Sequence, residues 1–202
     1  MRTTPRRMTA LALAAVTALT LGACGDDAGD DAGDDDTTTT TEAAAAEPVT
    51  VTFVDYGFQG LPDSVPAGTK FSVTNSSTAE LHEFVAFKIP DAEKRSVEEL
   101  MALPEEEGQA ALGGPPAAVL LGPPGGGEQI AAVGDGTLAD PGRYLVACFI
   151  PTGADPAKYL EAASAGGDGP PQVEGGPPHF TKGMRAELTV TSGDKRTGAT
   201  AG

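Results

Sequence analysis

Short runs of alternating apolar and polar residues occur along this chain, separated by blocks of glycine and proline. The run at 49–54 reads VTVTFV, the run at 70–75 reads KFSVTN, and the run at 184–191 reads MRAELTVT. Alternation with a period of two is the pattern of a half-buried β-strand. A weaker example lies at 128–133. These runs predict short strands, each with one face toward a core.

Two further runs are apolar at nearly every position. HEFVAFKI at 82–89 and RYLVACFI at 143–150 show no polar face, which is typical of strands buried on both sides. Between the runs lie GGPP at 113–116, GPPGGG at 122–127 and a longer glycine- and proline-rich segment at 166–178. These blocks predict loops.

Two short helices are expected between the strands. Ser96 and Glu99 have the spacing of a capping box, which predicts a helix from 96 to about 103. Asp155 and Pro156 are suited to the cap and the first turn of a second helix, ending near 163. Many short strands without regular strand–helix alternation indicate an all-β sandwich or barrel.

The chain begins with a segment typical of export. Three arginines precede an uncharged apolar stretch at 8–21, which is too short to span a bilayer and therefore indicates a signal peptide over 1–23. The stretch LGAC at 21–24 resembles the lipobox of bacterial lipoproteins. That resemblance implies a lipid on Cys24 and an extracytoplasmic protein anchored to the bacterial cell membrane. An ordinary signal peptide with a chance cysteine is the other interpretation.

An acidic segment follows, and the chain as a whole is also strongly negative. Residues 24–47 have no apolar periodicity and contain nine acidic residues, so we expect a disordered tether; a cation-binding tail is the alternative. The formal charge of −16 disfavours nucleic acid, so we expect no such partner, and it repels anionic lipid headgroups, so the lipid would provide the anchoring. One domain is expected over 48–192, followed by a disordered tail at 193–202.

The candidate metal ligands are few. The chain has two cysteines, and if Cys24 carries lipid, Cys148 is a lone thiol that is a liability unless buried or bound. The other soft or borderline ligands of the mature chain are His82, His179, Met184 and Met101. Two imidazoles, a thiolate and a thioether are the ligand set of type 1 copper.

Three segments make this chain resemble the cupredoxins, the plastocyanin and azurin family. GTKFSVTN at 68–75 resembles the family strand that ends in Asn before the first ligand, and His82 lies where that ligand belongs. GRYLVAC at 142–148 resembles the Gly-x-Tyr-x-x-x-Cys approach to the thiolate. HFTKGM at 179–184 matches the plastocyanin-like His-x4-Met spacing.

The resemblance implies a cupredoxin-like Greek-key β-sandwich with short helical insertions, and one type 1 copper per chain. It implies His82, Cys148 and His179 as ligands, with Met184 axial. Such a protein would be a monomeric electron carrier with a redox partner protein, and not an enzyme. The chain departs from the family in one respect, because 30 residues lie between the cysteine and the second histidine, where the family has a few.

Other interpretations of the same residues stay open. One is a copper lipoprotein for storage, delivery or sensing, and another is a metal-free cupredoxin-like interaction module. Zinc could bind the cysteine and both histidines, but Met184 would then have no role. A catalytic cysteine–histidine pair is disfavoured, because Cys148 lies in an apolar strand of an acidic protein rather than in an electropositive, partly exposed site.

Overall fold

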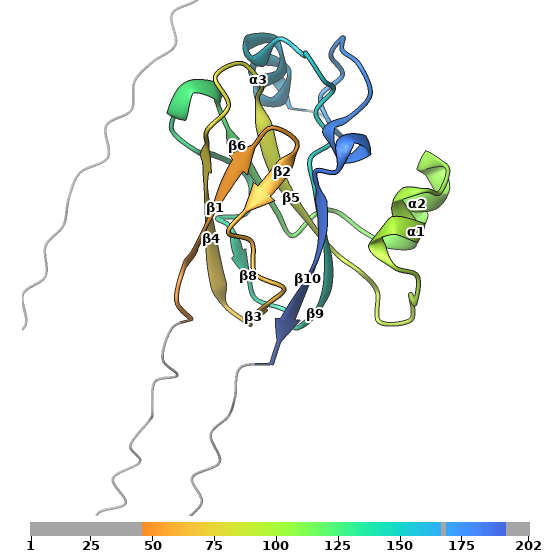
Figure 1. The fold of residues 1–202 in the computed structure, drawn as a ribbon. Coiled ribbons are helices and arrows are strands. Elements are labelled where there is room, and N and C mark those ends of the chain that lie inside the picture. Colours follow the sequence, from red (N-terminus) through yellow and green to blue (C-terminus); the bar gives the residue numbers. More distant parts are fainter. Residues whose placement is uncertain (1–45, 167–168, 193–202) are drawn as a thin grey trace, which may run out of the picture. The chain divides into compact units, whose positions relative to one another are not determined.

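A computed structural model describes residues 46–166 and 169–192 (Figure 1). The predicted signal peptide, Cys24, most of the predicted tether and the predicted tail lie outside the described residues. Within this described part, no helix is both long enough and apolar enough to cross a membrane.

The smaller sheet has four strands in the order β2-β1-β4-β8. β1 runs parallel to β4, whereas the other two neighbouring pairs are antiparallel. Its strands are β1 (Val49–Val54), β2 (Gly57–Gln59), β4 (Thr69–Asn75) and β8 (Thr137–Leu138).

The larger sheet has six strands in the order β3-β10-β9-β5-β6-β7. β9 and β5 are at its centre, and each lies antiparallel to its neighbours. The strands are β3 (Ser64–Pro66), β5 (His82–Lys88), β6 (Ala118–Gly122), β7 (Ile130–Val133), β9 (Gly142–Ala147) and β10 (Arg185–Thr191).

The two sheets enclose one hydrophobic core. Phe71 of β4 stacks on Phe84 of β5 with ring centroids 5.2 Å apart, so the contact joins the two sheets. Both rings are fully buried, as are Phe53 of β1 and Leu188 of β10. Burying one face of each sheet against the other is what makes a sandwich stable. The expected all-β sandwich with short helical insertions is therefore confirmed.

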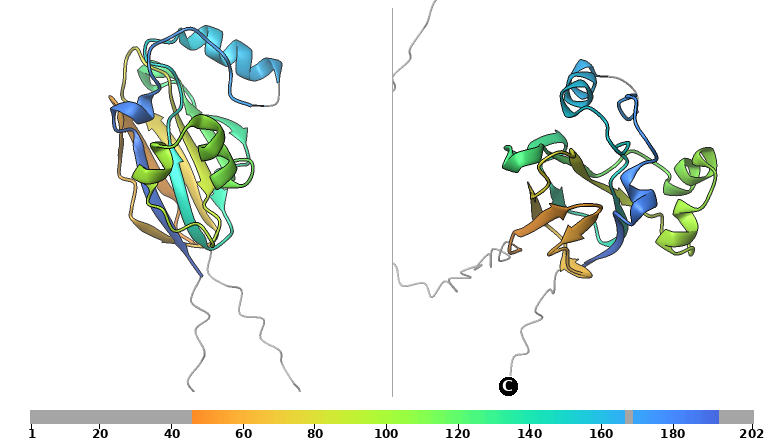
Figure 2. Two further views of the ribbon diagram at one scale, coloured as in Figure 1. Left: turned by 90° about the vertical axis from the view of Figure 1, so that its right-hand side faces the viewer. Right: turned by 45° about the horizontal axis from the view of Figure 1, so that its top comes forward.

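A second hydrophobic cluster covers the outer face of the larger sheet. Helices α1 (Val97–Met101) and α2 (Glu105–Leu112) pack there, as the left view of Figure 2 shows. Leu145 of β9 contributes to this cluster, whereas Tyr144 beside it faces the main core. Residues on both faces are thus buried, which explains the apolar runs of the two central strands.

Both predicted helix caps are present. The Ser96 hydroxyl accepts the backbone N–H of Glu99 at 3.2 Å, and the Glu99 carboxylate accepts that of Ser96 at 2.8 Å. The Asp155 carboxylate caps α3 (Pro156–Ala165) by accepting backbone N–H groups of its first turn. α3 lies at one end of the sandwich, in the segment between β9 and β10 (Figures 1 and 2).

All six predicted strands are present, with bounds within three residues of those expected. The strands β2, β3, β6 and β8 and the helix α2 were not predicted. The strands β2, β3 and β8 have only two or three residues, and β6 lies between glycine- and proline-rich blocks. No residue of α2 is fully buried, so its apolar pattern is weak. Cys148 and Met184 were expected inside strands, but the strands end at Ala147 and begin at Arg185.

Candidate metal centre

The candidate ligands converge on one end of the larger sheet. His82 begins β5, Cys148 directly follows β9, His179 begins the 3-10 turn η2 (His179–Lys182), and Met184 directly precedes β10. β5 and β10 both run antiparallel to β9, and Ala147, the last residue of β9, pairs with Arg185 at the start of β10 and with Val85 in the middle of β5. The end of β9 and the start of β10 therefore lie beside the first half of β5, which begins with His82.

Three of these side chains form a tight cluster. The Nδ1 atoms of His82 and His179 lie 3.1 Å apart, and the Sγ of Cys148 lies 3.3 Å from Nδ1 of His179. Two donors bound to one ion at typical bond lengths of about 2.0–2.3 Å lie roughly 3–4 Å apart. All three side chains are fully buried. These two separations fit one metal ion shared by two imidazoles and a thiolate, and the ligand atoms of all three residues lie within 4.8 Å of one another.

Met184 is next to this cluster through its backbone. It is fully buried, and its carbonyl accepts the N–H of Cys148 at 3.1 Å. Its own N–H donates to the carbonyl of His179 at 3.3 Å. These two hydrogen bonds hold the backbone of Met184 beside Cys148 and His179.

Asn75 holds the loop that leads into His82. Its side-chain amide donates to the carbonyls of Glu80 at 2.9 Å and of Gly122 at 2.8 Å, and its side-chain oxygen accepts the N–H of Ser77 at 2.9 Å. Gly122 is the residue paired with His82 between β6 and β5. Asn75 is therefore a positioning residue for the first imidazole.

Glu83 is a buried carboxylate that links the centre to α3. It accepts the N–H of Phe149 at 2.9 Å and the hydroxyl of Tyr159 at 3.1 Å, while its own N–H donates to Cys148 Sγ at 3.4 Å. Burial raises the pKa of Glu83 to about 7, against the lowering effect of its two hydrogen bonds. The segment that separates the cysteine from the second histidine thus contacts the centre through Tyr159.

Glu80 lies on the other side of His179. Its carboxylate accepts the N–H of Gly153 at 3.2 Å, and one oxygen is 3.4 Å from His179 Nε2. The Glu80 oxygen and His179 Nε2 are close enough to interact electrostatically, but their geometry is not that of a hydrogen bond. Accordingly, Nε2 of His179 and Nε2 of His82 have no hydrogen-bond partner among the described residues.

Burial keeps the three clustered groups uncharged without a metal. It lowers the pKa of His82 to about 4, with a further lowering by His179. It also lowers the pKa of His179, although Glu80 acts in the opposite direction, and it raises the pKa of the Cys148 thiol well above its usual range. Neutral imidazoles can ligate a metal directly, whereas the thiol must release its proton when a metal binds.

Sequence reasoning identified the four candidate ligands but not the residues around them. A signal for Glu83 was present, because it is a lone acidic residue in an otherwise apolar run and such a side chain must find buried partners. Glu80 and Tyr159 have no comparable signal, since their contacts join segments far apart in the chain.

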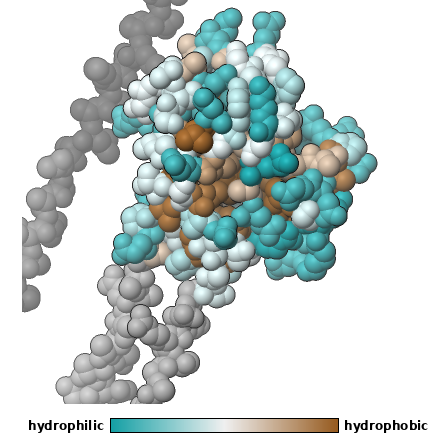
Figure 3. Space-filling view, viewed as in Figure 1, coloured by the Kyte–Doolittle hydropathy of each residue, from teal (hydrophilic) through white to brown (hydrophobic). Residues whose placement is uncertain are grey.

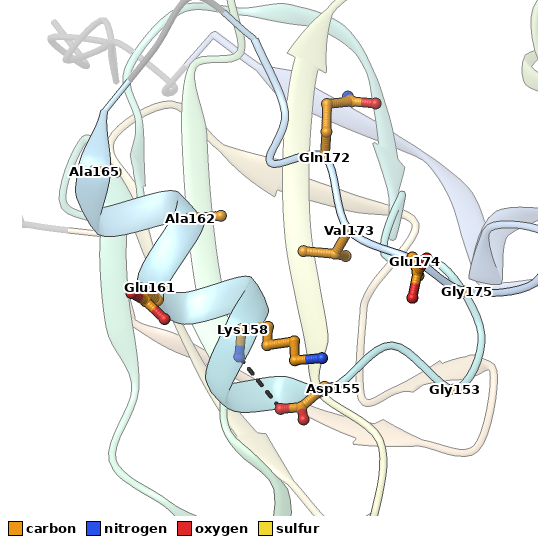
Figure 4. A pocket seen from close by; sticks show the side chains of 10 residues that line it. All are labelled: Gly153, Asp155, Lys158, Glu161, Ala162, Ala165, Gln172, Val173, Glu174 and Gly175. Atoms are coloured by element: carbon orange, nitrogen blue, oxygen red, sulfur yellow. Dashed lines mark hydrogen bonds between the residues drawn. The ribbon is translucent and has the colours of Figure 1, made fainter.

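A hollow of about 750 Å³ lies away from this centre, between α3 and residues 172–175 (Figure 4). Charged side chains, Asp155, Lys158, Glu161 and Glu174, line it together with small residues. None of the four candidate ligands is among its lining residues, so the hollow is not part of the centre.

Comparison with known proteins yields structural similarity only. No family model and no curated protein matches the chain. A reduced auracyanin from Roseiflexus castenholzii is 21% identical over 73% of this chain and 98% of that one, with a TM-score of 0.41. Auracyanin B is 19% identical over 74% and 92%, with 0.31. Auracyanin A from Chloroflexus aurantiacus, described as a "blue" copper protein, is 17% identical over 71% and 99%, with 0.35.

Proposed function

We propose that this protein is a membrane-anchored, extracytoplasmic copper protein that transfers single electrons through a type 1 centre. The observation that carries the proposal is the buried cluster of His82, Cys148 and His179, with donor atoms 3.1 and 3.3 Å apart. Bound copper would supply one-electron chemistry, because it cycles between Cu(I) and Cu(II). This donor set suits both oxidation states, since thiolate favours Cu(I) and imidazole suits either.

The residues around the cluster have complementary tasks. His82 and His179 would bind the copper through neutral nitrogen atoms, Cys148 would bind it as a thiolate, and Met184 is proposed as the axial thioether. Asn75 and the paired ends of the central strands hold these residues in place. A rigid donor set does not have to rearrange when the charge of the metal changes, and rapid electron transfer needs this property.

The location is proposed from the sequence. A lipid on Cys24 would anchor the protein, and the tether at 24–47 would reach roughly 25 Å as a flexible coil and about 75 Å when fully extended. The domain could then contact a redox partner in the membrane or in solution as a monomer.

Copper loading tests the metal assignment directly. The full chain is loaded with Cu(II), freed of excess metal by gel filtration, and analysed for metal content and visible absorption. We expect one copper per chain and an intense blue absorption that disappears on reduction. Colourless protein that elutes without metal would contradict the proposal.

A second candidate is copper storage, delivery or sensing. It is favoured by the complete burial of both imidazoles, because a buried ligand edge slows electron exchange between proteins and suits retention of the metal. A slow electron self-exchange rate together with tight Cu(I) binding would identify this function. A metal-free interaction module would instead keep its stability and activity when Cys148 is replaced by Ser.

A further inference from the structure

None of the candidate ligands reaches the surface. His82, Cys148, His179 and Met184 each have 0% exposure. A small solute or a partner protein therefore cannot touch a ligand directly in this conformation. Any access to the centre depends on a side chain that contacts a ligand on one side and solvent on the other.

Tyr56 is such a side chain, and it contacts both imidazoles. Its ring centroid lies 5.1 Å from that of His179 and 6.4 Å from that of His82, with edge-to-face angles of 68° and 89°. The residue itself is partly exposed and packs against the main core. Its ring therefore lies between the imidazole pair and the surface.

The backbone holds Tyr56 in an unusual conformation. It lies in the two-residue turn between Val54 and Gly57, which pair across β1 and β2. With a φ of 61°, it is the one non-glycine residue of the described segments that has a positive φ. This conformation is unfavourable for a residue with a side chain and persists only where surrounding contacts determine it. Here the contacts are those that place the ring on the histidines.

A cation lies over a face of the Tyr56 ring. The Nζ of Lys182 lies 4.5 Å from the ring centroid of Tyr56. Lys182 belongs to η2, the same turn that begins with His179. A cation over an aromatic face is an attractive contact, so the turn that carries the second imidazole also holds the ring in position.

We propose that Tyr56 is the lid of the metal centre, the residue that closes both imidazoles to solvent and excludes small solutes from the ligands. That Tyr56 covers the imidazoles is inferred from the ring contacts and the burial of both histidines alone. That this cover affects electron exchange rests on the function proposed above. Glu80 is the competing access route, because its side chain is 20% exposed and reaches His179 Nε2. Glu80 approaches one imidazole only, whereas Tyr56 contacts the two.

Carbethoxylation of the metal-free full chain by diethylpyrocarbonate tests the lid without copper. The chain contains only two histidines, so histidine modification counted by mass spectrometry reports this site alone. We expect Tyr56→Ala to react at least about tenfold faster than the unmodified protein, since access no longer waits on a local opening. Tyr56→Phe keeps the ring and should react at the original slow rate.

Two control variants make the result specific. Phe87→Ala removes a ring of the second cluster, on the outer face of the larger sheet, and should leave the rate unchanged. Glu80→Ala should change it far less than Tyr56→Ala does. The lid is wrong if Tyr56→Ala reacts as slowly as the unmodified protein, if Phe87→Ala accelerates the reaction equally, or if Glu80→Ala gives the larger increase.

A second measurement on copper-loaded protein separates the lid from the proposed function. Hexacyanoferrate(III) is a small oxidant that removes one electron from the reduced centre and is itself reduced to hexacyanoferrate(II). We expect it to oxidise Tyr56→Ala at least about tenfold faster than Tyr56→Phe, because the smaller side chain uncovers the imidazoles. Equal rates would overturn the lid. If no variant binds copper, the proposed function fails while the carbethoxylation result still decides the lid.

Discussion

The Nδ1 atoms of His82 and His179 lie 3.1 Å apart in the interior, although His179 comes 97 positions after His82 in the chain. The sulfur of Cys148 faces the same point, and the Nε2 atoms of both rings lack hydrogen-bond partners among the described residues. A cation held by the two Nδ1 atoms and the thiolate would bind only the folded protein, because the unfolded chain does not bring these donors together. Metal binding and folding should therefore be coupled.

Replacing the thiol tests this coupling. In Cys148→Ser we expect no intense blue absorption and no rise in the unfolding temperature on adding copper, because the hydroxyl is not a thiolate donor. In the unmodified protein, free copper at 100 times its dissociation constant should stabilise the fold by about 2.7 kcal/mol. Thermal unfolding with and without copper measures the difference.

The matched control is the other cysteine. Cys24→Ser should keep the blue absorption and the copper-dependent stabilisation, but it should move the protein from the membrane to the soluble fraction. Retention of Cys24→Ser in washed membranes would contradict the lipid anchor.

Met184 is expected to tune the centre rather than to create it. Met184→Leu keeps an apolar side chain of similar volume but removes the thioether, so copper and the blue absorption should remain. The axial ligand tunes the reduction potential, and loss of a donor to Cu(II) should raise it. Voltammetry measures the shift, and Met101→Leu, in the second cluster, should show none. An unchanged potential in Met184→Leu would remove this residue from the ligand set.

Asn75 should be important for stability and for metal affinity together. Asn75→Ala removes three hydrogen bonds and leaves the Gly122 carbonyl without that partner, so we expect a loss of about 2–4 kcal/mol in the free energy of unfolding. Thr52→Ala, which removes an exposed hydrogen bond of β1, should cost less than about 0.5 kcal/mol. Urea unfolding and competitive copper titration provide the two measurements, and a similar loss in both variants would be evidence against a positioning role.

Glu83 predicts a pH dependence of the metal-free protein. Its pKa is raised from 4.5 to about 7, so in this interval the folded state holds a proton that the unfolded chain has released. Glu83 therefore makes the folded state less stable as pH rises, by at most about 1.4 kcal/mol per unit. The pKa of His82 is lowered from 6.5 to about 4, so as pH falls through this range the unfolded chain binds a proton before the folded state does. His82 therefore makes the folded state less stable as pH falls.

Comparison with Glu83→Gln separates the contribution of the Glu83 carboxyl to the pH dependence of stability from that of the histidines. The glutamine has no such titration but leaves His82 and His179 in place. The stability of the variant relative to the unmodified protein should rise between pH 5 and pH 8, measured by urea unfolding of both. A constant difference across this range would mean that Glu83 titrates normally.

The strands and the candidate ligands could be read from the sequence because their signals are local. A half-buried strand exposes alternate residues, so the pattern of β1, β4 and β10 is visible within a few residues. Histidine and cysteine are rare in this chain, and their spacing before Met184 was informative without any contact. The short strands β2, β3 and β8 could not be predicted, since two or three residues hold no period and pairing partners determine them.

Only the tertiary structure decided how the centre is enclosed. The sequence by itself predicted a thiol, two imidazoles and a thioether in or near the strands of an all-β domain, because those residue types and periodicities are properties of the chain alone. The burial of both imidazoles, the hydrogen bond from the Glu83 N–H to Cys148 Sγ, and the edge-to-face contact of Tyr56 with His179 depend on contacts between segments distant in sequence. Such contacts form when the sheets pack, and no local pattern encodes them.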